Sequence, residues 1–124
     1  MTGFLAGRVA WVTGGVTGMG RAIAVALARA GADVAIGSLT AAVHGERVGR
    51  ETALDVGEDA FIATARTMES EGVRCLALPL NVRLDASVQS SYEQIVAGLG
   101  PIDVLVNAAG HGGRHAMVGH PDDF

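Results

Sequence analysis

The sequence predicts an α/β fold built on a doubly wound parallel sheet, and three observations support this prediction. Short apolar runs alternate with helix-forming segments along the whole chain. A glycine-rich turn at residues 13–20 separates the first apolar run from the first helical segment. The helical segments are long enough for the crossovers that parallel strands need. The predicted order is βαβαβαβ, and the 124 residues form at most one domain.

The first predicted strand covers residues 8–13 and the first helix covers residues 18–30. The strand contains an apolar run too short for a helix, and the helical segment is rich in alanine. Gly31 is suited to the left-handed conformation that ends many helices. Helical spacing places four small or apolar side chains on one face, where they would pack on the sheet: Ile23, Ala26, Leu27 and Ala30.

The second and third strands are predicted at residues 33–37 and 74–80. Between them, residues 38–57 are polar and interrupted by glycine, which indicates an enlarged surface loop. Residues 58–70 regain helical periodicity, with one face formed by Phe61, Ile62, Ala65 and Met68.

The third helix and the fourth strand complete the chain. Asp85 is a suitable N-cap residue, and Gly100-Pro101 would end the helix that follows it. Residues 102–107 are almost continuously apolar, which predicts a strand covered on both faces. Residues 108–124 show no periodicity and are predicted to form a loop. The predicted packing stripe of the third helix, which assigns its tyrosine to the core, is Val88, Tyr92, Ile95, Val96 and Leu99.

Right-handed crossovers place the four strands in the order 3-2-1-4. The fourth strand would then be an apolar edge without a neighbour, which predicts aggregation or association of the chain. The chain is therefore expected to be truncated before the second half of such a sheet.

Composition narrows the class of protein. The net charge of −4 argues against a nucleic-acid partner, and no apolar run is long enough to span a membrane. The single cysteine, Cys75, lies in an apolar run and is interpreted as a small buried residue. A lone cysteine suits a reducing compartment, so the sequence predicts a cytoplasmic protein.

The glycine-rich turn has the form of a phosphate-binding device. A strand that passes through glycines into a helix start presents free N–H groups and the positive end of the helix dipole to an anion. Glycines also allow close approach of a pyrophosphate. The alternative is a purely structural strand-to-helix turn, but the strand before it and the second strand after it favour dinucleotide binding.

The spacing Thr13-Gly14-x-x-x-Gly18-x-Gly20 resembles the signature of the short-chain dehydrogenase/reductase family, which has a Rossmann-type fold. Three further segments resemble that family in the same order. They are Gly31-Ala32-Asp33-Val34, Leu80-Asn81-Val82 with asparagine in place of the usual aspartate, and Asn107-Ala108-Ala109-Gly110. The resemblance extends from about residue 7 to residue 107.

The resemblance implies an NAD(P)-dependent oxidoreductase that transfers hydride between nicotinamide and a small carbonyl or alcohol substrate, as a homo-oligomer when complete. It implies a cofactor site whose pyrophosphate and ribose contacts are Gly14, Thr17, Gly18, Met19 and Gly20. Asn81 and Val82 would contact the adenine edge, although Asn81 is alternatively a turn residue after its strand. The segment that supports the cofactor ribose at the end of the fourth strand is Asn107, Ala108, Ala109 and Gly110.

Cofactor choice depends on the end of the second strand. Where NAD-selective members of the family carry an acidic residue, this chain has Ser38, followed by Leu39 and Thr40. A hydroxyl does not repel a 2′-phosphate as a carboxylate would, which favours NADP over NAD. The arginine that usually follows in NADP-binding members is absent, and Arg47 or Arg50 could replace it.

No catalytic residue is assigned. The family uses a serine and a Tyr-x-x-x-Lys pair, whereas this chain contains no lysine and its only tyrosine, Tyr92, is followed four residues later by Val96. Asp103 is interpreted as structural. The chain alone is therefore predicted to be inactive, and the alternatives are a non-catalytic dinucleotide-binding module or an oligomerisation unit.

A metal site is not expected either. The histidines at the end of the chain lie within ten residues of one another, but no carboxylate or cysteine stands at ligand spacing with them. These histidines are His111, His115 and His120.

Overall fold

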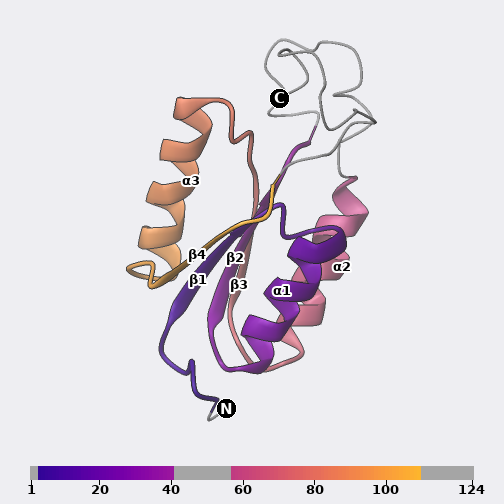
Figure 1. Cartoon of the computed structure of the whole chain (residues 1–124), viewed down its shortest axis with the longest axis vertical. Coiled ribbons are helices and arrows are strands. Elements are labelled where there is room, and N and C mark those ends of the chain that lie inside the picture. Colours follow the sequence, from indigo (N-terminus) through magenta and orange to yellow (C-terminus); the bar gives the residue numbers. More distant parts are fainter. Residues whose placement is uncertain (1–2, 41–56, 110–124) are drawn as a thin grey trace, which may run out of the picture.

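The computed structural model describes residues 3–40 and 57–109, and these form one parallel sheet flanked by helices (Figure 1). The strands are β1 (Val9–Thr13), β2 (Asp33–Ser38), β3 (Cys75–Pro79) and β4 (Val104–Asn107). Their order in the sheet is β3-β2-β1-β4, so the predicted α/β class and strand order are confirmed.

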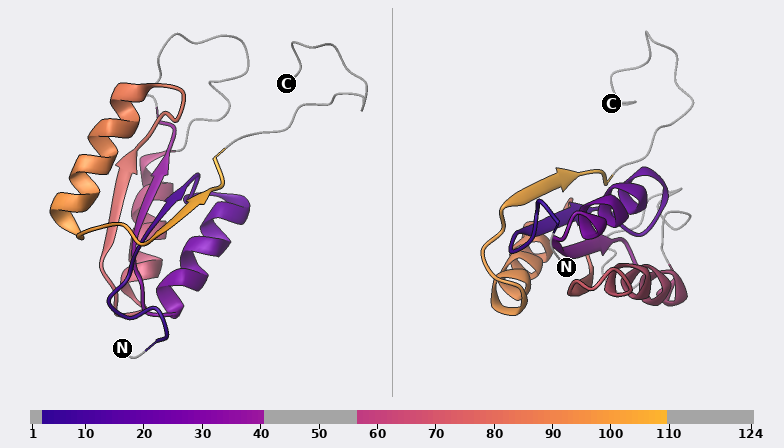
Figure 2. Two further views of the ribbon diagram at one scale, coloured as in Figure 1. Left: turned by 60° about the vertical axis from the view of Figure 1, so that its left-hand side comes forward. Right: turned by 90° about the horizontal axis from the view of Figure 1, so that it is seen from below.

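Three helices cover the sheet, two on one face and one on the other (Figure 2). They are α1 (Gly18–Arg29), α2 (Glu58–Glu69) and α3 (Asp85–Gly98), and their bounds agree with the prediction to within a residue or two. α1 and α2 lie against one face and α3 lies against the other. None of these helices, nor any other in the described ranges, has the length and apolar character needed to cross a membrane.

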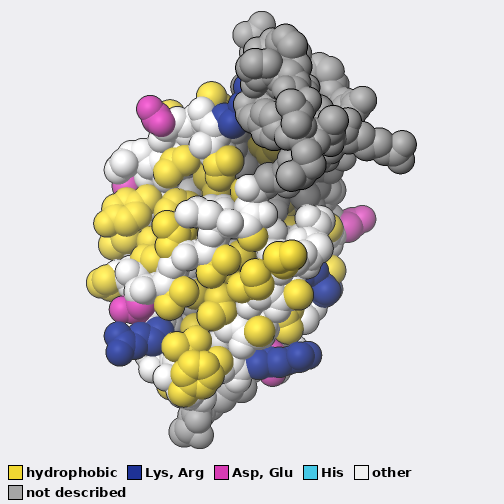
Figure 3. All heavy atoms as spheres, viewed as in Figure 1, with side chains coloured by type: hydrophobic (Ala, Val, Ile, Leu, Met, Phe, Trp, Pro, Cys, Tyr) yellow, Lys and Arg dark blue, Asp and Glu magenta, His cyan; other side chains and the backbone are white. Residues whose placement is uncertain are grey.

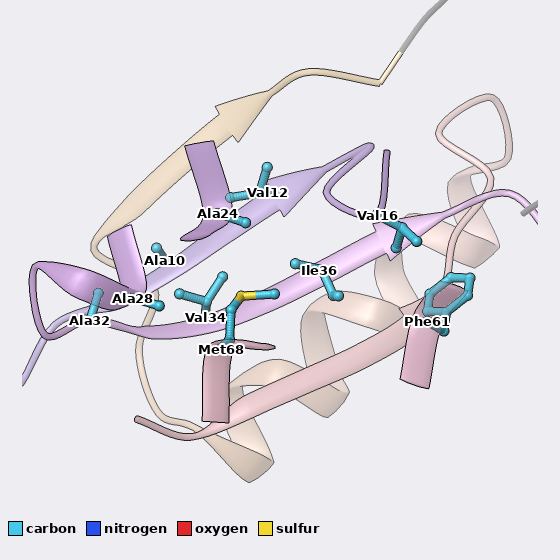
Figure 4. Packing of buried hydrophobic residues seen from close by; sticks show 10 residues of the cluster. All are labelled: Ala10, Val12, Val16, Ala24, Ala28, Ala32, Val34, Ile36, Phe61 and Met68. Atoms are coloured by element: carbon cyan, nitrogen blue, oxygen red, sulfur yellow. The ribbon is translucent and has the colours of Figure 1, made fainter. Parts of the chain in front are cut away.

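The larger core lies between the sheet and helices α1 and α2 (Figure 4). Alternate residues of β1 and β2 enter it because successive strand side chains lie on opposite faces. The predicted packing face of α1 is only partly correct, because Leu27 contacts this core but the fully buried positions are others. Ala26 is exposed, and the buried stripe of α1 is Gly20, Ala24 and Ala28. The same core also contains Ala10, Val12, Val34, Ile36, Phe61 and Met68. On α2 the predicted face is only partly correct, because Ile62 is exposed and Thr64 is buried instead.

The smaller core lies under α3 and overturns the assignment of Tyr92 to the interior. Ile95 is fully buried and Ser91, one turn earlier, is also buried, whereas Tyr92 is 47% exposed. The helix is rotated so that the row through Ser91 and Ile95 meets the sheet, and Tyr92 stands about 100° away from that row. The members of this cluster are Val9, Trp11, Ala35, Leu78, Leu80 and Ile95.

The start of α3 also differs from the prediction. Leu84, not Asp85, is the N-cap residue, and it offers no side-chain cap. Asp85 is instead the first helical residue, where its negative charge interacts favourably with the positive end of the helix dipole. The Ser87 hydroxyl, in the first turn, accepts a hydrogen bond of 3.0 Å from the Asn81 N–H.

β4 is half covered, so the prediction that both of its faces are buried is wrong for the described residues. Its residues alternate between half-buried and exposed, and Leu105 is 55% exposed. Val104 and Val106 pack on the core beneath α1, while no described helix covers the opposite face of β4. Hydrophobic side chains are correspondingly prominent at the surface over this part of the sheet (Figure 3).

At the amino ends of the strands, polar groups are paired. The carboxylate of Asp33 accepts hydrogen bonds from the Arg74 backbone N–H at 2.8 Å and from its guanidinium at 2.8 and 3.0 Å. The same guanidinium donates to two carbonyls at the end of α3. Asp103 accepts the Val9 N–H at 2.9 Å, which supports its interpretation as a structural residue.

Candidate functional site

The glycine-rich turn lies at the carboxyl end of the sheet, between β1 and α1. Its first two N–H groups are held by one carbonyl of the neighbouring strand. The N–H groups of Gly14 and Gly15 both donate to the Gly37 carbonyl oxygen, at 2.6 and 3.3 Å. The turn is therefore fixed against the last residues of β2.

Three of the glycines are required by close packing within the protein. A Cβ at Gly20 would collide with the Gly14 carbonyl oxygen, and one at Gly14 would lie 2.8 Å from the Cα of Ala109. A Cβ at Gly15 would lie 2.7 Å from the Cγ2 of Ile36. The absence of these side chains lets the first turn of α1 lie directly on the turn that precedes it.

Gly18 serves a different purpose. Its φ of +55° is a conformation that favours glycine, yet a Cβ there would meet no atom of residues 3–40 and 57–109 within 4 Å. Its side-chain position therefore faces open space at the start of α1. Open space at this position leaves room for a ligand to approach the backbone.

The amino end of α1 can accept an anion. Thr17 is the N-cap residue but makes no side-chain hydrogen bond to the helix, and the first turn contains no acidic residue. Thr17, Gly18 and Met19 are exposed, and the Met19 side chain is 77% exposed. The first N–H groups of a helix have no intrahelical acceptors, so this end attracts a phosphate group.

The end of β4 is joined to the same turn through Thr13. The buried hydroxyl of Thr13 donates to the Val106 carbonyl at 3.4 Å and accepts the Ala109 N–H at 3.3 Å. Ala108 and Ala109 consequently lie beside Gly14, and Asn107 pairs with Thr13 in the sheet. Gly110 lies outside the described residues.

The end of β2 carries two buried hydroxyls without partners. Ser38 is the last residue of β2 and is 7% exposed, and Leu39 follows it. Among the buried side-chain nitrogen and oxygen atoms of residues 3–40 and 57–109, the Oγ of Ser38 and the Oγ1 of Thr40 lack a hydrogen bond. Each such group costs about 1–3 kcal/mol of stability, which calls for an explanation. Thr40 was not a predicted site residue, and only its place two residues beyond Ser38 could have indicated it.

Asn81 forms a turn, which supports the alternative interpretation of this residue. It is 6% exposed, and its Oδ1 accepts the Arg83 N–H at 3.0 Å. Its neighbour Val82 is 48% exposed at the same edge of the sheet. The structure therefore places both residues at the carboxyl end of β3, with Asn81 also holding the loop that leads to α3.

Groups suited to nucleophilic or acid–base chemistry do not gather here in the described part of the chain. Burial, with a further contribution from the charge of Glu69, raises the pKa of Cys75 to about 12, so its thiol stays protonated at neutral pH. No group of three or more metal-ligating side chains occurs within residues 3–40 and 57–109. Arg47, Arg50 and the histidines at positions 111, 115 and 120 lie outside the described residues. The edge is equipped to bind a phosphate-containing ligand.

Comparison with known proteins identifies the family. A family model for short chain dehydrogenases matches residues 8–123. General stress protein 39 of Bacillus subtilis is 39% identical over 106 residues, which are 86% of this chain and 32% of that protein. The 5-keto-D-gluconate 5-reductase of Escherichia coli is 32% identical over 95% of this chain and 40% of its own length.

Solved structures agree with this result. Carveol dehydrogenase from Mycobacterium avium in complex with NAD has a TM-score of 0.78 and 27% identity, over 98% of this chain and 43% of that one. A blue fluorescent protein from a metagenomic library in complex with NADPH has a TM-score of 0.73 and 33% identity, over 96% and 43%. The chain thus spans less than half the length of the relatives it matches. By its glycine-rich turn, its strand order and these matches, the chain belongs to the short-chain dehydrogenase family.

Proposed function

We propose that this chain binds NADP or NAD for an oxidoreductase that transfers hydride between the nicotinamide and a small carbonyl or alcohol compound. The observation that carries the proposal is the open backbone at Gly18, at the uncapped start of α1 and at the same edge of the sheet as the unpartnered hydroxyl of Ser38 that ends β2. The complexes of related structures with NADPH and NAD support it.

The residues at this edge fit a dinucleotide. The backbone N–H groups of Gly18 and Met19 would hold the pyrophosphate, and Gly14 and Gly20 keep the turn narrow enough for it. Ser38 and Leu39 would contact the adenosine ribose, and Thr17 would contribute to the same side of the turn. Asn81 and Val82 would contact the adenine, and the second ribose would rest on Asn107, Ala108, Ala109 and Gly110. When bound, the nicotinamide supplies the hydride chemistry.

This chain's contribution is binding and orientation. It contains no lysine, and Val96 stands four residues after Tyr92, so the Tyr-x-x-x-Lys pair of the family is not present. We expect the chain alone to show no turnover above a control without protein. The same observation favours, as a second candidate, a dinucleotide-binding module without catalysis of its own.

Two further observations concern the cellular location and the oligomeric state of the protein. The lone cysteine supports a cytoplasmic location, because cytoplasmic thiols remain reduced. The family resemblance supports a homo-oligomer for the complete protein.

The test compares two glycines that share their conformation but lie at opposite ends of the sheet. Gly7 and Gly18 both have positive φ, and a Cβ at either one would meet no atom of the described residues within 4 Å. Gly18→Val and Gly7→Val therefore introduce similar backbone strain, and only the first fills the space where the pyrophosphate would lie. Gly18→Ala and Gly7→Ala form a milder pair, in case valine prevents folding.

Isothermal titration calorimetry with NADP and with NAD measures the outcome. We expect substitution at Gly18 to weaken both cofactors by about tenfold or more, a change of about 1.4 kcal/mol, and substitution at Gly7 to leave both unchanged. Equal effects of the two substitutions, or wild-type affinity in both, would contradict the proposed function.

A further inference from the structure

Arg21 lies in the first turn of α1, close to the open backbone at Gly18. Its N–H donates to the Thr17 carbonyl oxygen at 3.2 Å, and this hydrogen bond closes the turn. The Cα of Arg21 is therefore about 4.5 Å along the helix axis from the Cα of Gly18, since each residue rises about 1.5 Å. A positive charge so near the positive end of the helix dipole destabilises the helix, which suggests that the charge serves another purpose.

The guanidinium of Arg21 is held by neutral groups of α2, which lies on the same face of the sheet as α1 (Figure 2). Its Nε donates to the Oγ1 of Thr64 and its Nη2 donates to the Oγ1 of Thr67, each at 3.4 Å. The Thr67 hydroxyl in turn donates to the Ala63 carbonyl oxygen at 2.9 Å, so its lone pairs remain available to the arginine. Hydroxyl oxygens orient the guanidinium but carry no charge that would neutralise it.

The arginine at the other end of α1 is treated differently. Arg29 forms an ion pair of 3.1 Å with Glu71. In the part of the chain that the structure describes, no carboxylate forms such a pair with Arg21, and the first turn of α1 contains no acidic residue. The charge of Arg21 therefore adds to the positive potential at the start of α1 without being cancelled by a bonded carboxylate.

We infer that Arg21 raises the affinity of the start of α1 for a pyrophosphate through its charge, without contacting the ligand. Thr64 and Thr67 hold the guanidinium against α2, and the space at Gly18 stays open. A fixed cation near an anion site raises the local potential, and its effect falls with distance and with salt. The inference rests on the proposed function, and it assigns to Arg21 an electrostatic role in binding.

The experiment measures the binding of ADP, which carries a pyrophosphate but no nicotinamide, so that hydride transfer plays no part. Calorimetry is performed at ionic strengths of about 10 mM and about 1 M, where the Debye length is about 30 Å and about 3 Å. In Arg21→Gln we expect ADP to bind about threefold more weakly than in wild type at low salt and equally at high salt. Arg21→Lys, which keeps the charge but loses the planar fork of donors, should match wild type at both.

Two controls separate the charge from the rest of the side chain. Arg29→Gln makes the same change of charge on the same helix, about 12 Å farther along its axis, and should leave the affinity for ADP unchanged. Adenosine lacks the pyrophosphate and is uncharged, so wild type and Arg21→Gln should bind it with equal affinity.

Failure of the inference and failure of the proposed function give different results. The inference is wrong if the loss in Arg21→Gln is the same at both ionic strengths, or if Arg21→Lys or Arg29→Gln shows the same loss. It is also wrong if Arg21→Gln binds ADP as wild type does at low salt, and in all these cases dinucleotide binding stands. If a folded wild-type chain binds neither ADP nor NADP nor NAD, the proposed function fails and the inference fails with it.

Discussion

The polar groups at the two ends of the sheet differ in whether they are hydrogen-bonded within the protein. At the amino end, Asp33 is bound by three donors of Arg74, and Asp103 is bound by the Val9 N–H. At the carboxyl end, the hydroxyls of Ser38 and Thr40 have no partner and the start of α1 has no side-chain cap. β2 contains an example of each kind, since it begins at the hydrogen-bonded Asp33 and ends at the unpartnered Ser38.

This difference separates stability from binding within one sheet. Paired groups at the amino end stabilise the positions of β2, β3 and the end of α3, because Arg74 also donates to the carbonyls of Gly98 and Leu99. Unpaired groups at the carboxyl end lower stability, and folded proteins retain such groups where a function needs them. The comparison predicts that substitutions at the two ends will affect different measurements.

The largest effect is expected at Gly20, where the carboxyl end is most tightly packed. In Gly20→Ala the new Cβ would collide with the Gly14 carbonyl oxygen, which belongs to the backbone and cannot move independently. We expect a loss of about 1–3 kcal/mol or more in the free energy of unfolding, measured with urea, and loss of nucleotide binding.

Another helical glycine provides the control for Gly20. A Cβ at Gly98, at the end of α3, would lie 3.6 Å from a Leu76 methyl group, an ordinary contact. Gly98→Ala should therefore stabilise the chain, by up to about 1 kcal/mol. If both substitutions had the same sign, the close approach of α1 to its preceding turn would not be the controlling factor.

A smaller effect is expected from breaking the pairing at the amino end. Asp33→Ala removes the acceptor of three Arg74 donors, and we expect a loss of about 1–2 kcal/mol, because the guanidinium is largely exposed. Nucleotide affinity should stay at the wild-type value, and a parallel loss of affinity would break the proposed division between the two ends. Arg8→Ala, which removes a single exposed contact of 3.5 Å to Asp103, should cost less than about 1 kcal/mol.

At neutral pH the smallest effect concerns Cys75, at the first residue of β3, because its titration changes stability only at alkaline pH. Burial raises the pKa of this thiol from 9.0 to about 12 in the folded chain, so the folded state retains a proton that the unfolded state releases. The resulting stabilisation is complete below pH 9 and is lost as the pH rises toward 12. Urea denaturation at several pH values should show a decline in wild type that is weaker in Cys75→Ala. Identical pH profiles would show that the thiol titrates normally.

Much of this fold could be predicted because the local signals agree with one another. Apolar runs, the helix end at Gly31 and the glycine-rich turn all indicate one topology, and the structure has it. Tyr92 was misplaced because helical periodicity defines a stripe but not its rotation, which here depends on how Ile95 and Ser91 meet the sheet. The coverage of β4 was misjudged because an apolar run does not reveal which faces a helix will cover, and in the described residues only the face of Val104 and Val106 packs on the core.

The candidate site was predictable in its backbone and less so in its side chains. The glycine spacing located the turn, and the position of Ser38 at the end of β2 was correctly anticipated. The lack of hydrogen-bond partners for Ser38 and Thr40 could not be predicted from the sequence. Whether a buried hydroxyl finds a partner depends on residues from several segments that are distant in the sequence. The turn formed by Asn81 was one of two open interpretations, and the hydrogen bonds from the Arg83 N–H to its Oδ1 and from the Leu84 N–H to its carbonyl oxygen support it.

The strand order also has a consequence for how the chain folds. β1 lies inside the sheet between β2 and β4, and these two strands are far apart in the sequence. Val9 pairs with Asp33 of β2, whereas Ala10 pairs with Val104 of β4, which the ribosome synthesises much later. The second connection is about four times as long as the first, which adds about 1.2 kcal/mol of loop-closure entropy to its formation. During synthesis from the amino terminus, β1 and β2 can therefore pair early, while the other edge of β1 waits for most of the chain. We expect the backbone of β1 at Trp11 to keep one edge unpaired throughout that interval, until Leu105 pairs beside it.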